Sequence, residues 1–303
     1  MPAPMKIRRS MLLVPAGDER KIAKARAAGA DVLMFDLQDS VPFDDVAKRR
    51  ARDTLRAQLA QRDPDQREVN VRVNAIDSPW LIADLEMVLE TGVDSVTFAE
   101  LRSAGDVIHF ERLLASLRPG LAVPEVLLDV ETPAALCDLE AIARAATLVT
   151  GLMVGVNDYA LEVHSSGALF GQRGEPSQDH LTWIRPKTVA VARAHGWTVC
   201  DAAMLKDPRD LEAGRAAMAL SKRMGFDGWV VLFPPQTGVA NEVFSPSAEE
   251  IAWASEVVAR YATEQAHPAA ERVATVPRQH LQLARYMVAQ AAAIARPAQR
   301  AAG

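Results

Sequence analysis

SMLLVPAGDERKIAKARAAGADVLMFDL, residues 10–37, shows the pattern that decides the fold. Apolar runs at residues 10–16 and 31–37 flank a polar, Ala-rich segment with helical periodicity, which predicts a strand, a helix and a second strand. The alternation continues downstream, with further apolar runs that begin at residues 69, 93, 124, 150, 197 and 226. Eight strand–helix units in this order predict an α/β fold, the (β/α)8 TIM barrel. A doubly wound sheet is the rival fold, but no G-x-G-x-x-G follows the first run.

The pattern changes after the eighth unit. Residues 245–266, SPSAEEIAWASEVVARYATEQA, open with a capping signature and predict a helix. Residues 278–295, RQHLQLARYMVAQAAAIA, predict a second, amphipathic helix. We therefore expect a catalytic barrel domain over residues 1–246 and a helical extension over residues 247–303. Because the apolar face of the last helix lies beyond a completed barrel, we expect it to pack on a neighbouring subunit.

Composition argues against several classes of protein. The 303 residues (32.9 kDa) are 49% hydrophobic and 24% charged, and the net charge of −5 includes no long basic run, so we expect no nucleic-acid partner. No stretch approaches the roughly 20 apolar residues of a membrane span, and none resembles a signal peptide, so we expect a cytoplasmic protein without a membrane partner. Cys137 and Cys200 fit neither a disulfide framework nor a zinc site. Lys6, Arg8 and Arg9 precede the first strand and are expected in a solvated N-terminal segment.

Polar residues follow the predicted strands at the end where a TIM barrel carries its active site. They are Asp36, Gln38, Asp39, Arg72, Asn74, Glu100, Glu131, Asn157, Asp158 and Asp201. Carboxylates that converge there would repel one another unless a cation lies among them. Glu131 and Asp158 stand at corresponding points of adjacent strands, so they could share a divalent ion, and Mg²⁺ typically takes one or two carboxylates plus waters. Helix capping is the alternative interpretation of Asp158.

Several blocks of the chain resemble the citrate lyase β-subunit-like proteins of the HpcH/HpaI aldolase superfamily. These blocks are RRSMLLVPAGDERKIAKARAAGADVLMFDLQDSV, VRVNAIDSP, DVETPAAL, GLMVGVNDYA, MGFDGW and NEVFSPSAEEI, and the likeness covers roughly residues 8 to 290. The resemblance implies a (β/α)8 barrel with a C-terminal helical extension, assembled as a homotrimer or hexamer. It also implies a lyase or aldolase that cleaves or forms a C–C bond next to a carboxylate, often on an acyl-CoA, with Mg²⁺.

The resemblance also assigns roles to individual residues. Glu131 and Asp158 would hold the metal, Mg²⁺ with Mn²⁺ as the alternative ion. Arg72 would hold a carboxylate or enolate oxygen of the substrate, which suits its permanent charge and forked shape. Asp36 and Asp39 belong to the acidic block that follows the second strand in the family. From their charge, either could act as the catalytic base or hold Arg72 in place. A carboxylate paired with arginine keeps a low pKa and is a weak base, so we favour the orienting role.

Four positions depart from the family pattern. Gln38 stands where the family has Glu, Glu100 where it has Lys, and Phe233 where it has His; Thr275 replaces a catalytic Asp of malyl-CoA lyase-like relatives. Arg72, Glu131, Gln38 and Asn74 are the expected substrate-binding residues.

The expected function is that of a Mg²⁺-dependent carbon–carbon lyase or aldolase. Its substrate would be a 3-hydroxyacyl-CoA of the malyl, citramalyl or citryl type, which it would cleave to, or form from, an acyl-CoA enolate and a 2-oxo acid. A CoA-independent pyruvate-type aldolase and a non-catalytic metabolite-binding protein remain the alternatives.

Overall fold

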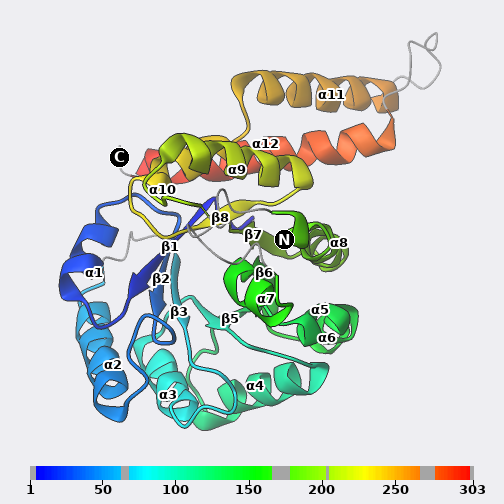
Figure 1. Cartoon of the computed structure of the whole chain (residues 1–303). Helices are drawn as coiled ribbons and strands as arrows, with labels where there is room; N and C mark the ends of the chain where they lie inside the picture. Colours follow the sequence, from blue (N-terminus) through cyan, green and yellow to red (C-terminus); the bar gives the residue numbers. More distant parts are fainter. Residues whose placement is uncertain (1–4, 63–67, 166–177, 203–204, 267–276, 301–303) are drawn as a thin grey trace. The chain divides into compact units, whose positions relative to one another are not determined.

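The computed structural model describes residues 5–62, 68–165, 178–202, 205–266 and 277–300. Eight parallel strands close into a barrel in sequence order, and helices lie outside it (Figure 1). This confirms the TIM barrel predicted from the alternating apolar runs. The strands are β1 (Ser10–Pro15), β2 (Val32–Asp36), β3 (Glu68–Arg72), β4 (Ser95–Phe98), β5 (Glu125–Val130), β6 (Val149–Val154), β7 (Thr198–Asp201) and β8 (Gly228–Val231).

Helices follow the strands along the chain. They are α1 (Glu19–Arg26), α2 (Asp45–Leu59), α3 (Leu81–Thr91), α4 (Ala104–Leu117), α5 (Pro133–Cys137), α6 (Leu139–Ala145), α7 (Val156–Glu162), η2 (Asp179–Leu181, a 3₁₀ helix), α8 (Ile184–His195), α9 (Leu211–Met224) and α10 (Gln236–Val243). Asp18, Asp44 and Ser103 start α1, α2 and α4, and each side chain accepts a hydrogen bond from the backbone N–H three residues later. These caps satisfy backbone donors that have no partner within the helix.

An apolar layer fills the barrel interior. Met11, Met34, Leu127, Met153 and Cys200 form one buried cluster contributed by five strands. Cys200 belongs to this layer, as its position in an apolar run indicated, and burial raises the pKa of its thiol. A buried neutral thiol is a poor nucleophile, so this cysteine has a packing role.

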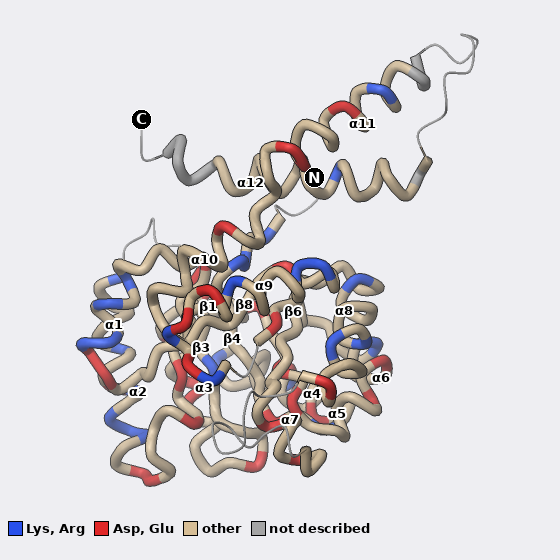
Figure 2. The backbone as a smooth tube through the Cα atoms, turned by 45° about the horizontal axis from the view of Figure 1, so that its top comes forward, with Lys and Arg blue, Asp and Glu red and all other residues tan. Residues whose placement is uncertain are grey.

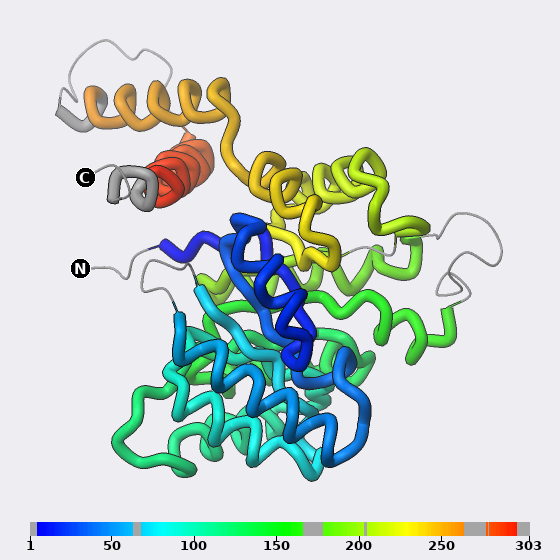
Figure 3. Tube along the Cα trace, turned by 90° about the vertical axis from the view of Figure 1, so that its left-hand side faces the viewer, coloured from blue at the N-terminus to red at the C-terminus, as the bar shows by residue number. Residues whose placement is uncertain are grey.

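The chain divides into two compact units, Arg8–Glu242 and a second one that comprises Met1–Ile7 and Val243–Gly303. The second unit contains α11 (Ala248–Ala266) and α12 (Arg278–Arg300), which lie side by side in Figures 1 and 3. This confirms the predicted helical extension. A reciprocal pair of hydrogen bonds between Ser247 and Glu250 forms the predicted capping box of α11.

Part of the apolar face of α12 is buried within this second unit. Ala254 and Val257 of α11 pack with Ala284 of α12 in one cluster. Leu283 and Tyr286 of α12 remain exposed. Packing of α12 on a neighbouring subunit, and the homotrimer or hexamer, therefore stay predictions.

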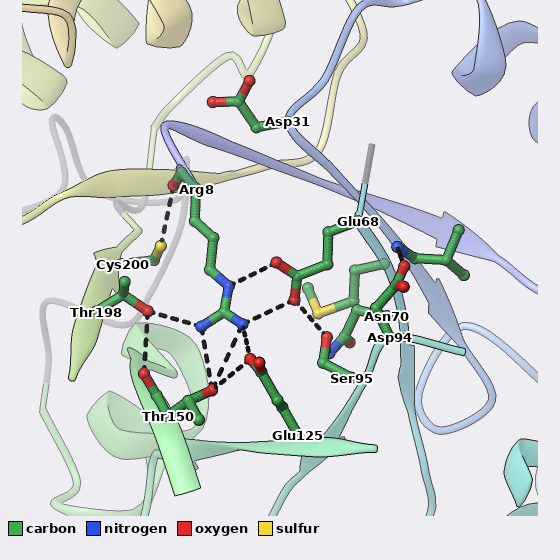
Figure 4. A network of polar contacts seen from close by, with 12 residues as sticks. Arg8, Asp31, Glu68, Asn70, Asp94, Ser95, Glu125, Thr150, Thr198 and Cys200 are labelled. Atoms are coloured by element: carbon green, nitrogen blue, oxygen red, sulfur yellow. Dashed lines mark hydrogen bonds and ion pairs between the residues drawn. The ribbon is translucent and has the colours of Figure 1, made fainter. Parts of the chain in front are cut away.

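A buried guanidinium, that of Arg8, joins the N-terminal ends of several strands (Figure 4). Its Nε and Nη2 donate to the two carboxylate oxygens of Glu68 at 2.8 and 2.9 Å, and Nη2 also donates to Glu125 at 2.8 Å. Nη1 donates to the hydroxyl of Thr198 at 2.8 Å. Glu68, Glu125 and Thr198 are the first residues of β3, β5 and β7, so this one side chain ties three non-adjacent strands together.

The prediction of a solvated N-terminal segment is wrong for Arg8 and Arg9, because each has a carboxylate partner inside the fold. The Arg9 guanidinium donates to both oxygens of Asp31 at 2.7 and 2.9 Å. Asp31 precedes β2 directly. Both arginines are buried, and such charges are stable inside a protein only when they are paired.

Charges of both signs are spread over the helices around the barrel, and Figure 2 shows no long basic run in the described parts of the chain. Within those parts, no helix has both the length and the apolar character that a membrane crossing requires.

We expect Arg8→Met to destabilise the protein by about 3–5 kcal/mol, because the part-buried carboxylates of Glu68 and Glu125 would lose the buried guanidinium that pairs with them. Urea unfolding followed by circular dichroism measures this. Arg215→Met is the control, since Arg215 forms its ion pair with Glu242 at the surface and its loss should leave the unfolding midpoint unchanged. An Arg8→Met midpoint equal to that of the parent protein would contradict the structural role of the buried network.

Candidate active site

A cavity of about 440 Å³ opens at the end of the barrel where the strands finish. Its walls combine apolar side chains of the barrel interior with a group of polar ones. The polar residues that line it include Asp39, Arg72, Asp129, Glu131, Asn157 and Asp158. The structure thus places four of the predicted site residues, Asp39, Arg72, Glu131 and Asp158, around one cavity.

Arg72 is held by a bidentate ion pair with Asp36. The two residues end β3 and β2 and are register partners in the sheet. Nε and Nη2 of Arg72 donate to the two Asp36 oxygens at 2.8 and 2.9 Å, and Nη2 also lies 3.2 Å from Asp39. Because Asp36 occupies one edge of the guanidinium, Nη1 is the nitrogen left to face a ligand.

Asp36 is fully saturated with donors. Besides Arg72, the backbone N–H groups of Gln38 and Ser40 donate to its carboxylate, each at 3.0 Å. Burial alone would raise the pKa of Asp36, but Arg72 and the Ser40 donors outweigh it and hold the pKa below its ordinary value. The geometry therefore favours the orienting role for Asp36 over that of a base.

Gln38 and Asn74, both predicted to bind substrate, lie beside the cavity and are not among the residues that line it. The amide of Gln38 donates to the Glu100 carboxylate. Asn74 donates to Asp84 of α3 at 2.6 Å and to the carbonyl of Leu37 at 3.1 Å. These bonds connect the loops of the barrel mouth to each other and to α3.

Asp129 is a cavity residue that the sequence reasoning missed. It lies in β5 two residues before Glu131, so both side chains point to the same face of the strand, and only 3% of Asp129 is exposed. Its Oδ1 has no hydrogen-bond partner among the described residues, and its Oδ2 lies 4.0 Å from Nη1 of Arg72. Burial raises the pKa of Asp129 to about 7, with Arg72 opposing and the neighbouring carboxylates adding to the rise.

Glu131 follows β5 and is also buried, with 2% of the residue exposed. One of its oxygens accepts a hydrogen bond of 2.6 Å from the backbone N–H of Glu100. Glu100, whose N–H makes this hydrogen bond, has a left-handed backbone with φ of 54°. This conformation is uncommon for a residue other than glycine. Burial, and after it the charge of Asp129, raises the pKa of Glu131 well above its ordinary value.

Gly155 makes room for both buried carboxylates. A Cβ atom at this position would stand 2.4 Å from the Cβ of Glu131, 2.6 Å from its Oε2 and 3.0 Å from Oδ1 of Asp129. No side chain fits there without a shift, and the atoms closest to Gly155 are those of the two acids. The oxygens of Glu131 and Asp129 therefore converge on the same point of the cavity wall.

Asp158 lies in a helix and not at a strand end. β6 ends at Val154, Gly155 takes the cap position, and Asp158 is the third residue of α7. The prediction of a strand ending in Asn157 and Asp158 is wrong, because the helix begins directly after Gly155. The capping alternative is wrong as well, since α7 has no side-chain cap. Asp158 is exposed and lines the cavity.

These residues fit a divalent cation. Asp129 has an unpartnered buried oxygen, and burial together with repulsion between neighbouring carboxylates raises the pKa values of Asp129 and Glu131. A cation among these carboxylates would stabilise their charged forms. Within the described ranges, no three His, Cys, Asp or Glu side chains are arranged to hold an ion together. That is compatible with Mg²⁺, which keeps several waters and uses one or two protein carboxylates.

The other departures contribute little to the cavity. Phe233 is half-buried and does not line it, and Thr275 lies outside the described residues.

Asp201, at the end of β7, has its partners within the fold. It pairs with Arg185 at 2.9 Å and accepts a hydrogen bond from the Ser221 hydroxyl at 2.5 Å, so its charge is compensated within the barrel wall.

Comparisons with known proteins agree with this architecture. The chain is 34% identical over 290 residues to the (3S)-malyl-CoA thioesterase of Cereibacter sphaeroides, covering 95% of each chain. It is 29% identical to citrate lyase subunit beta of Escherichia coli, covering 83% of this chain and 81% of that one. The crystal structure of CitE from Mycobacterium tuberculosis in complex with magnesium, acetoacetate and coenzyme A matches with a TM-score of 0.71 and 28% identity, covering 93% and 97% of the two chains.

A family model for HpcH/HpaI aldolase/citrate lyase matches residues 9–234, which include the whole barrel from β1 to β8. With the closed barrel, the acidic cavity at its mouth and relatives that span nearly the full chain, this chain belongs to the HpcH/HpaI aldolase/citrate lyase family.

Proposed function

We propose that this chain is a Mg²⁺-dependent carbon–carbon lyase that cleaves or forms a 3-hydroxyacyl-CoA from an acyl-CoA enolate and a 2-oxo acid. The proposal rests mainly on one observation: the carboxylates of Asp129, Glu131 and Asp158, which could bind a cation, line the same cavity as Arg72. Solved structures of relatives support the proposal. CitE from Mycobacterium tuberculosis was crystallised with magnesium, acetoacetate and coenzyme A, and the citrate lyase beta subunit from the same organism with oxaloacetate and magnesium.

Glu131 and Asp158 would hold the metal ion. When bound, Mg²⁺ supplies the positive charge that polarises oxygens of the 2-oxo acid unit. Asp129 adds negative charge beside Glu131, and the backbone N–H of Glu100 fixes one Glu131 oxygen. The oxygen of Glu131 that faces Gly155 is thereby left for a ligand.

Arg72 would stabilise the anionic oxygen that forms as the C–C bond breaks. Its Nε and Nη2 are fixed on Asp36, which sets the direction of Nη1 before any substrate arrives. A preorganised cation of this kind stabilises developing charge without the cost of reorienting in the transition state. Asp36 acts in this proposal as the residue that positions Arg72.

The CoA-independent aldolase stays the second candidate because of the charge around the cavity. Arg72 is the sole basic side chain among the described residues that line it, while four carboxylates do so. An acyl-CoA carries several phosphates, and a small 2-oxo acid carries none.

Product analysis tests the proposed function and separates it from thioester hydrolysis. The parent protein with Mg²⁺ is incubated with a panel of 3-hydroxyacyl-CoA thioesters, and 2-oxo acid and free CoA are measured together. A lyase releases 2-oxo acid and acyl-CoA, whereas a thioesterase releases free CoA. Absence of Mg²⁺-dependent 2-oxo acid from every thioester, while pyruvate and an aldehyde condense, would favour the CoA-independent reaction.

Turnover of malyl-CoA and citramalyl-CoA should be weak, with kcat/KM below about 10⁵ M⁻¹s⁻¹. Phe233 and Thr275 replace groups that could donate a proton, and a missing general acid typically costs roughly 10²–10⁴-fold. Steady-state kinetics with either thioester measures this. Efficient cleavage of either one would show that another residue supplies the proton.

Glu131→Gln and Asp158→Asn should each weaken Mn²⁺ binding at least about 10-fold, because a hard cation prefers an anionic oxygen. Isothermal titration calorimetry measures the affinity, and the melting temperature reports the fold. Glu162→Gln is the matched control on α7, because its carboxylate pairs with Arg102 at the surface and does not line the cavity. If both site variants bind Mn²⁺ as tightly as the parent, the metal does not bind at these residues.

Gly155→Ala should also weaken Mn²⁺ binding, because the added Cβ displaces the side chain of Glu131. Overpacking of this kind costs about 1–3 kcal/mol of stability, so thermal unfolding is recorded alongside the titration. Gly238→Ala in α10 is the control, as a Cβ there meets nothing within 4 Å. Parental Mn²⁺ affinity in Gly155→Ala would mean that the position of Glu131 is not critical.

A further inference from the structure

One side of the cavity is apolar and is not fully covered by the protein itself. Leu13 of β1 and Val230 of β8 line it from inside the barrel, and Leu232, the residue directly after β8, lines it at the mouth. Val230 and Leu232 are two residues apart, so their side chains point to the same side of the chain. We call Leu13, Val230 and Leu232 the apolar wall.

Each residue of the apolar wall keeps free surface. Leu13 and Val230 pack on the buried cluster of the barrel interior but are themselves only half-buried. Both lie in strands of a closed barrel and line the cavity, so their free surface faces the cavity. Leu232 is 56% exposed. A ligand that covers this surface removes it from water, which favours binding.

The charged residues of the cavity belong to other strands. In the closed order of eight strands, β1 is opposite β5, which carries Asp129 and precedes Glu131, and β3 with Arg72 lies midway between them. On the side of β7, β8 and β1, none of the described residues that line the cavity is charged. The amide of Gln236 on this side donates to the carbonyl of Pro208 at 2.8 Å. A carboxylate placed against the apolar wall would therefore lose its hydration without gaining a charged partner, which is costly.

An alkyl chain of a substrate can reach the apolar wall from two directions. In the proposed reaction, the carboxylate and oxo oxygens of the 2-oxo acid lie against the charged residues, so its third carbon and everything beyond it extend away from them. The acyl chain of the thioester enters through the mouth, where Leu232 lies. Either chain would cover the wall without placing a polar group on it.

We propose that Leu13, Val230 and Leu232 form a subsite for an alkyl chain of the substrate that is longer than a methyl group. The chain belongs to the 2-oxo acid or to the acyl part of the thioester. This inference rests on the proposed function, because it takes the cavity as the place where these substrates bind. It names the substituent that the site selects, which is a hydrocarbon chain and not a second carboxylate.

A series of 2-oxo acids tests the first source of the chain. Pyruvate, 2-oxobutyrate and 2-oxopentanoate differ by one methylene each, and each is titrated calorimetrically into the full-length protein with Mg²⁺ present. We expect the affinity to rise about fourfold with each methylene, which is the usual gain from burying one such group. 2-Oxopentanoate should therefore bind roughly 10- to 20-fold more tightly than pyruvate.

A series of thioesters tests the second source in the same way. Propionyl-CoA, butyryl-CoA and pentanoyl-CoA also differ by one methylene each. An affinity that rises along the thioesters and stays constant along the acids would assign the subsite to the acyl chain. The opposite result would assign it to the 2-oxo acid.

Two variants locate the effect, and a third is the control. Leu232→Asn makes the wall polar at an exposed position, and Val230→Thr keeps the shape of the side chain but replaces a methyl group by a hydroxyl. Each should lower the ratio of affinities between the longest and the shortest ligand at least about threefold. Leu161→Asn is the control, since Leu161 is 60% exposed in α7 and does not line the cavity, so the parental ratio should remain. If Val230→Thr does not fold, Leu232→Asn alone decides.

The outcomes separate this inference from the proposed function. If the parent protein with Mg²⁺ binds neither the acids nor the thioesters, the proposed function is wrong and the inference falls with it. If the ligands bind and the affinity changes by less than twofold along both series, the inference alone is wrong. It is also wrong if the gain with chain length survives unchanged in the wall variants that fold.

Discussion

Closure of the eight strands into a parallel barrel is the constraint on which the rest of the structure depends. Pairing of β8 with β1 brings both ends of the sheet together, so all strands finish at one mouth and start at one base. Several polar side chains near the strand ends are then buried, among them those of Arg8, Arg72 and Asp129. Each must be paired with another residue or with a ligand.

The two ends of the barrel meet this demand differently. At the N-terminal end, Arg8 is surrounded by Glu68, Glu125 and hydroxyl groups, and every guanidinium nitrogen has an acceptor in the fold. At the mouth, Arg72 is fixed by Asp36 on one side only, and Asp129 keeps an oxygen without a donor. The first arrangement is complete without a ligand and therefore serves stability. The second is incomplete, and incompleteness of that kind is typical of a binding site.

The sequence predicted the barrel well because its periodicity is a property of the whole chain, repeated eight times. It located Arg72 and Glu131 because both lie at or just after the end of an apolar run. Asp129 was missed because it lies inside such a run, where an acid was read as part of the strand; its two-residue spacing from Glu131 was the available signal. Arg8 was misjudged for a related reason, since its partners Glu68 and Glu125 lie far away in sequence. The predicted start of α7 was too late, because the N-cap residue is Gly155, which has no capping side chain that sequence analysis could detect.

The hydrogen bond from Glu100 to Glu131 has a consequence for how such a site can change over time. The donor is a backbone N–H, so the side chain at position 100 takes no direct part in the contact. The left-handed backbone there disfavours β-branched residues, and proline would remove the donor altogether. An unbranched side chain, even one of opposite charge, can therefore replace the exposed carboxylate of Glu100 at the cost of the hydrogen bond from Gln38, while the backbone contact to Glu131 is kept. The charge at the rim of the barrel mouth can therefore change by substitution, and with it the ligands that the rim attracts, while the buried carboxylate of Glu131 stays in place.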